Sequence, residues 1–214
     1  MAFVNPNRPS GLSPLRYLNG AKYDGKVNTY AIAAAVATPF YVGDLVSLAT
    51  GGSPLGIPNI ALTAAGSNPA VGVIVAVGLL PFGPYINVND LSKISRPTGA
   101  QTQIYYAAVS DDPNIVYEIQ EGGSATNLTS ATALSKNASI VYALPATGVV
   151  VSGTMLDGGT VSTATATLNL KILKFVQRID NNFVTSPATG GGAQKWEVII
   201  NNHTFGRGTG TVGI

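Results

Sequence analysis

Alternation of apolar and polar residues with a period of two is the pattern that most limits how this chain can fold. It is longest in TVSTATATLNLKILKF (160–175), where β-branched Thr and Val favour an extended backbone. Similar alternation occurs in IVYEIQE (115–121) and in KWEVIINNHTF (195–205). No segment of helical length has apolar residues at helical spacing. The sequence therefore predicts an all-β protein.

Turn residues divide the predicted strands into two units. Clusters of Gly, Pro, Asn and Ser recur about every ten residues, which is typical of small β-barrels and β-sandwiches. We predict an extended N-terminal arm over residues 1–26, because its Pro and Gly residues prevent regular structure. A β-barrel-like module follows over 27–97, and a second β-sandwich or β-barrel module over 98–214. The segment SRPTGAQ (95–101) is the predicted boundary.

Two local patterns stand out in the first module. Gly43 and Asp44 predict a bend, because glycine relieves a sharp turn and an Asp carboxylate bonds nearby backbone amides. The most apolar run, VGVIVAVGLL (71–80), is predicted to be a buried strand, since it is about half the length of a membrane span and is followed by Pro81. The N-terminal residues lack the apolar core of a signal peptide. We therefore expect a soluble protein with no membrane partner.

Charged residues are scarce in this chain. They make up 10% of it, against about 25% in typical soluble domains, and none lies between Asp44 and Asp90. Because a solvated surface normally carries charge at about a quarter to a third of its positions, we expect much of this surface to be covered by other subunits. The alternative is a neutral surface rich in Ser, Thr and Asn. The net charge of +2 is too small to indicate a nucleic-acid partner.

The N-terminal arm carries side chains that are common at protein interfaces. The stretch PLRYLNG (14–20) combines apolar, aromatic and Arg side chains, and aromatic and Arg residues often anchor protein contacts. We expect the arm to be ordered by contact with a neighbouring subunit or with its own barrel. The predicted interface residues are Arg8, Leu15, Arg16, Tyr17 and Leu18.

Candidate catalytic residues are few. Glu118 and Glu121 are three residues apart on a predicted strand, so they point to opposite faces and do not converge on one substrate bond; an ion pair between chains remains open to Glu118. His203 is the sole histidine and the chain has no Cys, so a zinc site lacks ligands, and we expect His203 to bond locally at a strand end. Asp111 and Asp112 are predicted to form a turn. We predict no catalytic, cofactor or metal residue and no enzymatic activity.

Three stretches of the chain resemble known proteins. They are FYVGDLVSLAT (40–50) with NPAVGVIVAVG (68–78), DDPNIVYEIQEGG (111–123), and LNLKILKFVQRIDNN (168–182) with KWEVIINNHTF (195–205). Together they are similar to the small β-rich head decoration proteins, or cement proteins, of tailed bacteriophages. The resemblance spans roughly residues 30–205, and it carries no catalytic or cofactor residue to this chain.

This resemblance implies a virion protein that is made in the host cytoplasm and located on the capsid surface. Such a protein binds the outside of the head and stabilises contacts between major capsid subunits. The implied partners are the major capsid protein and neighbouring copies of the chain in a homotrimer, with no cofactor and no directly bound nucleic acid. An alternative is a head-fibre or tail structural protein that binds a host surface.

Overall fold

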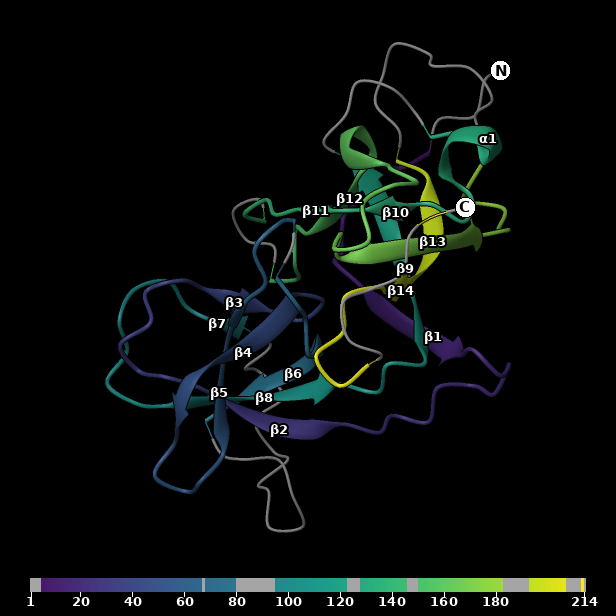
Figure 1. Ribbon diagram of the computed structural model, residues 1–214. Helices are drawn as coiled ribbons and strands as arrows, with labels where there is room; N and C mark the ends of the chain where they lie inside the picture. Colours follow the sequence, from purple (N-terminus) through teal and green to yellow (C-terminus); the bar gives the residue numbers. More distant parts are fainter. Residues whose placement is uncertain are drawn as a thin grey trace.

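The computed structural model describes residues 5–66, 68–79, 95–122, 128–145, 150–182, 193–206 and 213. These residues form a closed β-barrel, in the lower part of Figure 1, and a second β-sheet in its upper part. The all-β fold predicted from the alternation is confirmed. Helical structure in the described ranges consists of α1 (Ser130–Ala133) and one 3₁₀ turn, η1 (Gly158–Thr160). No helix in this part of the chain has the length and apolarity needed to cross a membrane.

Five strands close the barrel in the order β2-β5-β4-β6-β8, and β8 pairs back onto β2. They are β2 (Asn28–Ile32), β4 (Leu45–Gly52), β5 (Pro58–Leu62), β6 (Gly72–Gly78) and β8 (Tyr105–Ser110). Their inward side chains form one buried cluster, in which Val46, Ile74 and Val109 are fully buried. The apolar run that contains β6 is therefore a buried strand, as predicted.

The barrel extends further along the chain than the sequence indicated. β8 lies beyond residue 97, the predicted end of the first module, yet it pairs with β2 and β6. The predicted boundary segment is itself part of the barrel unit, because β7 (Ser95–Arg96) pairs with β3 (Phe40–Tyr41) and the Arg96 side chain is fully buried. Its guanidinium donates to four backbone carbonyls, those of Ala34, Val36, Thr38 and Pro97.

The second sheet is built around β9 (Ile115–Gly122) and β14 (Lys195–Ile200), in the order β10-β13-β14-β9-β12-β11. The remaining strands are β1 (Ser13–Tyr17), β10 (Asn137–Ala138), β11 (Ile140–Val141), β12 (Met155–Asp157) and β13 (Leu170–Phe175). β1 pairs with the first half of β9 and β12 pairs with its last two residues. Tyr117, Leu170 and Trp196 are fully buried in the core of this sheet.

The segment 1–26, predicted as an extended arm, contains a strand of this second sheet. β1 runs antiparallel to β9 with Tyr17 opposite Ile115, and the register shifts at Leu15. Leu12, just before the strand, is 1% exposed and belongs to the sheet's core. Residues 12–17 of the predicted arm are thus held by their own chain, through the second sheet.

Much of the longest alternating stretch is not a strand. Its last residues form β13, whereas residues 163–169 form bends and turns. The cause is local hydrogen bonding, because Ser162 Oγ accepts from the backbone N–H groups of Ala164 and Thr165. Small Ser, Thr and Ala side chains bury little area in a sheet, so hydroxyl-to-backbone bonds can outweigh strand pairing there.

The barrel and the second sheet meet at the bend predicted at Gly43 and Asp44, which is confirmed. Gly43 has φ +95°, and a Cβ at this position would lie 2.3 Å from the carbonyl oxygen of Ser10, so the close approach requires glycine. Asp44 is fully buried. Its Oδ2 accepts from the Tyr41 N–H at 2.8 Å, and its Oδ1 accepts from Thr154 Oγ1 at 3.4 Å. Burial raises the pKa of the Asp44 carboxyl to about 6.

Candidate interaction surface

Four of the five residues predicted as an interface lie in β1 or directly after it, and Arg8 precedes the strand by five positions. Their own chain already contacts several of them. Leu15 and Arg16 are half-buried, and Arg16 forms an ion pair within the chain. Tyr17 packs against the core of the second sheet. Arg8 is exposed, and Leu18 is 45% exposed. Among these five, Arg8 and Leu18 are therefore the side chains best placed to meet another molecule.

Seven charged residues gather on one face of the second sheet, and we name them the charged cluster. They are Arg16, Glu118, Lys174, Arg178, Asp180, Lys195 and Glu197. The chain has only 12 basic and 10 acidic residues in all, so charge is strongly concentrated here. At the centre, Glu118 on β9 and Glu197 on β14 are cross-strand partners. Like charges directly opposite each other on a sheet are destabilising unless cations offset them.

Two cations neutralise Glu118. Arg178 donates to it with both terminal nitrogens, at 2.7 and 2.9 Å, which is the strongest geometry for an Arg–carboxylate pair. Lys195 Nζ lies 3.7 Å from the same carboxylate. Arg178 also donates from Nε to Asp180 at 3.0 Å. The segment that follows β13 is thereby fastened to β9.

Glu197 has its own two cations. Arg16 Nη2 lies 2.7 Å from Oε2, and Lys174 Nζ lies 3.2 Å from Oε1. The Glu197 side chain is only 11% exposed, so this ion pair is better shielded from water than an ordinary surface pair. Because Arg16 is on β1 and Lys174 is on β13, the cluster ties the first strand of the chain to its last strands.

Beside the charged cluster, a tight turn holds one apolar side chain in water. Ile179 is 96% exposed. The turn is fixed from beneath by the buried Asn181, whose Nδ2 donates to the carbonyls of Val176 and Lys195 and whose Oδ1 accepts from the Lys195 N–H. A turn held in this way loses little conformational freedom on binding.

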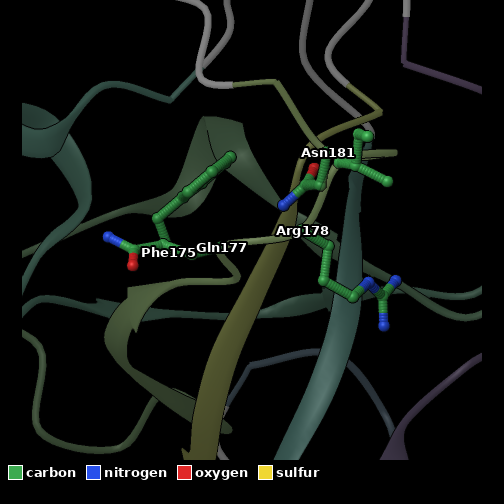
Figure 2. A pocket seen from close by; sticks show the side chains of 5 residues that line it. Phe175, Gln177, Arg178 and Asn181 are labelled. Atoms are coloured by element: carbon green, nitrogen blue, oxygen red, sulfur yellow. The ribbon is translucent and has the colours of Figure 1, made fainter.

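An open pocket of about 570 Å³ adjoins this turn, lined by Phe175, Gln177, Arg178, Ile179 and Asn181. In Figure 2, Arg178 leaves the segment on the opposite side from Phe175. The Phe175 ring is fixed by an edge-on contact with Trp196, with ring centroids 5.5 Å apart. The pocket therefore combines an aromatic wall with amide and guanidinium groups, a mixture suited to a polypeptide surface.

The described exterior of the barrel lacks exposed charge, in contrast to the charged cluster. Among its described residues, 28–66, 68–79 and 95–110, the charged residues are Asp44 and Arg96, and both are fully buried. The described barrel therefore exposes no charged side chain. The surfaces of well-behaved soluble proteins carry charged residues at about a quarter to a third of their positions.

The hairpin of β4 and β5 presents a second apolar side chain on a fixed turn. Leu55, at its tip, is 65% exposed, and Leu48 on β4 is 42% exposed. The buried Ser53 holds the turn, because its Oγ accepts from the N–H groups of Leu55 and Ile57. The structure thus contains two similar features in different settings, Leu55 on a barrel whose described residues expose no charge and Ile179 beside the charged cluster.

The two glutamates considered in the sequence do point to opposite faces of β9. Glu118 is in the charged cluster, whereas Glu121 is 3% exposed on the core side. Glu121 accepts from Trp196 Nε1 at 2.7 Å, from Gln194 Nε2 at 3.3 Å and from the Leu128 N–H at 3.4 Å. Burial raises the pKa of the Glu121 carboxyl. The Trp196 partner, on a distant strand, explains the burial of Glu121.

His203 bonds locally and Asp112 forms part of the predicted turn, whereas Asp111 bonds a distant strand. His203 Nδ1 accepts from the Phe205 N–H at 3.0 Å. Asp112 Oδ1 accepts from the Asn114 N–H at 2.8 Å, and Asp111 accepts from Tyr30 Oη at 2.6 Å. Within the described ranges, no three His, Asp or Glu side chains lie together in a way that could hold a metal ion.

Comparison with known proteins gives no relative. No protein-family model, no curated protein and no solved structure matches the chain. The site must therefore be interpreted from its own geometry. Sequence reasoning missed the Glu118–Glu197 pairing, which depends on strand register, and it missed Ile179. The sequence did carry a signal for Ile179, because it precedes Asp and Asn in QRIDNN and these residue types favour a turn. An apolar residue in a turn has few neighbours to pack against.

Proposed function

We propose that this protein is a capsid decoration protein of a bacteriophage. It binds the outside of the head, stabilises contacts between major capsid subunits and has no enzymatic activity. The short strand and turn patterns that resemble head decoration proteins, described above, favour this assignment over other structural roles. The proposed partners are the major capsid protein and further copies of the chain.

The observation that carries the proposal is the absence of exposed charge on the described barrel residues. A domain that functions alone in water normally needs such charge to stay dispersed. A domain that is covered in an assembly does not, and burying uncharged groups avoids the large desolvation penalty of ions. An all-β protein whose barrel is covered in this way is well suited to a permanent place in a shell.

The Ile179 turn supplies an anchor for the shell. Its side chain is almost fully exposed, its backbone is fixed by Asn181, and the adjoining pocket offers space for a partner side chain. Apolar anchors on preorganised turns, with charged groups at the rim, are typical of strong contact points in protein interfaces. The charged cluster at the rim would set the orientation of the contact rather than its strength.

The test uses phage heads that lack the chain. Purified protein is added to them, and the particles are imaged by electron microscopy. We expect regularly spaced added density on the outside of the head, and heads that survive heating better than untreated ones. Protein that stays in the supernatant would refute the proposal. Density confined to a fibre or to the tail would instead favour the head-fibre or tail alternative.

Two exposed variants locate the contact. Ile179→Lys places a charge on the proposed anchor, and we expect it to lower occupancy of the heads at least tenfold. Leu18→Lys makes the same kind of change at the exposed residue after β1, and we expect near-normal occupancy. If Leu18→Lys lowers occupancy and Ile179→Lys does not, the capsid contact lies at the N-terminal segment predicted from the sequence instead.

A further inference from the structure

We propose that copies of this chain associate with one another through the exterior of the barrel, with the β4–β5 hairpin and Leu55 in the contact. This rests on the proposed function only in that the barrel is covered in the assembled state. A second copy of the same chain covers the barrel, and this contact is distinct from the one made by the Ile179 turn.

The β4–β5 hairpin has the features of a preformed contact. Leu55 and Leu48 are both large apolar side chains exposed on it. The turn is rigid, because the Ser53 N–H donates to the Ile57 carbonyl at 2.8 Å and the Gly56 N–H donates to the Ser53 carbonyl at 2.9 Å. Burying two leucines gains free energy, while the fixed turn keeps the ordering cost of association low.

Symmetry explains why a second copy fits this surface. In a rotationally symmetric oligomer, residues near the axis face their own counterparts, so any charge there meets a like charge. Like-charge contacts in an interface cost several kcal/mol. The described barrel residues present no such charge, since Asp44 and Arg96 are buried beneath the surface. These described surfaces of two or three barrels can therefore meet without like-charge repulsion.

The charged cluster does not suit self-association. Around Ile179, a symmetric contact would bring Arg178 and Asp180 close to their own counterparts. Lys174 and Lys195, on the same sheet face, would add further like-charge repulsion. A different protein with a complementary charge pattern meets no such constraint, whereas an identical copy avoids the repulsion only in an off-axis arrangement that sets each Arg178 against Asp180 of the other copy. The two apolar turns are thus assigned to two different partners.

The experiment compares the intact protein with Leu55→Lys and Ile179→Lys by sedimentation velocity at high micromolar concentration. Both sites are exposed, so both variants should fold, which thermal unfolding by circular dichroism verifies. We expect the intact protein and Ile179→Lys to associate equally. Leu55→Lys should weaken association at least tenfold, because it places a like charge in each copy at the contact.

The absence of cysteine allows a direct second measurement. Under mild oxidation, Leu55→Cys should give disulfide-linked dimers much faster than Ile179→Cys, which serves as the matched control. Equal rates for the two variants, or an intact protein that sediments only as a monomer, overturn the inference. An intact protein that is monomeric but still coats heads overturns the inference and leaves the proposed function standing. An intact protein that associates as expected but does not bind heads supports the inference and overturns the proposed function.

Discussion

Replacing Asp44 with Asn tests the buried carboxylate at the junction between the barrel and the second sheet. Burial raises the Asp44 pKa from 3.8 to about 6. The folded state therefore holds its proton more tightly than the unfolded state. Below pH 3.8 the carboxyl is neutral in both states and folding carries no ionisation penalty. As pH rises through 6 the folded protein must ionise a buried group, and stability is lost.

The size of this effect follows from the difference between the two pKa values. Each pKa unit corresponds to about 1.4 kcal/mol, so the full loss is about 3 kcal/mol. In Asp44→Asn, the amide oxygen can still accept from the Tyr41 N–H, and the amide nitrogen can donate to Thr154 Oγ1. The variant keeps the Tyr41 bond, reverses the donor in the Thr154 contact and does not ionise. It also changes the contact with the Ser152 hydroxyl, which costs stability equally at every pH, so its stability should lack this pH-dependent loss.

Urea unfolding followed by circular dichroism, between pH 4 and pH 8, measures the prediction. Other titrating groups are common to both proteins, so their contributions cancel in the difference between the two unfolding free energies. That difference should shift in favour of Asp44→Asn as pH rises, by an amount approaching about 3 kcal/mol. The same substitution at the half-buried Asp157 is the control. A difference that stays constant from pH 4 to pH 8 would refute the reasoning.

Two further substitutions test how the barrel and the first strand are held. Arg96→Lys should lower the free energy of unfolding by about 3 kcal/mol, because one ammonium group cannot reach the four carbonyls that the guanidinium bonds; a loss below about 1 kcal/mol in urea unfolding would contradict this. Leu12→Ala should cost about 2–5 kcal/mol by leaving a cavity in the core of the second sheet. Leu18→Ala, at an exposed site, should change stability by less than about 0.5 kcal/mol, and equal effects of the two would show that β1 is not packed as described.

The parts of the fold that were predicted from sequence depend on local chemistry. Alternation in IVYEIQE corresponds to a strand because Tyr117 and Ile119 face a core on one side and Glu118 meets the cations Arg178 and Lys195 on the other. Gly43 and Asp44 gave a bend because backbone conformation and a short carboxylate act within a few residues. Such signals are contained in the segment itself, and so they can be recognised in a single sequence.

The parts that failed depend on contacts between distant segments. Residues 95–101 look like a linker because they contain Pro97 and Gly99, and only the burial of Arg96 and the pairing of β7 with β3 show that they belong to the barrel unit. The charged cluster could not be predicted from the sequence for the same reason. Glu118 and Glu197 become neighbours through the register of β9 and β14, and no spacing along the chain encodes a register between strands so far apart.

The pairing of β1 with β9 has a consequence for synthesis of the protein on the ribosome. Ser13 cannot pair until Glu118 has been translated. The delay is on the order of 10 s at typical elongation rates. The barrel strands, β2, β4, β5, β6 and β8, are all translated during that interval and are contiguous in the chain apart from β3 and β7, which pair with each other. We expect the nascent chain to close its barrel first and to leave its first strand unpaired meanwhile, as the segment most open to chaperones.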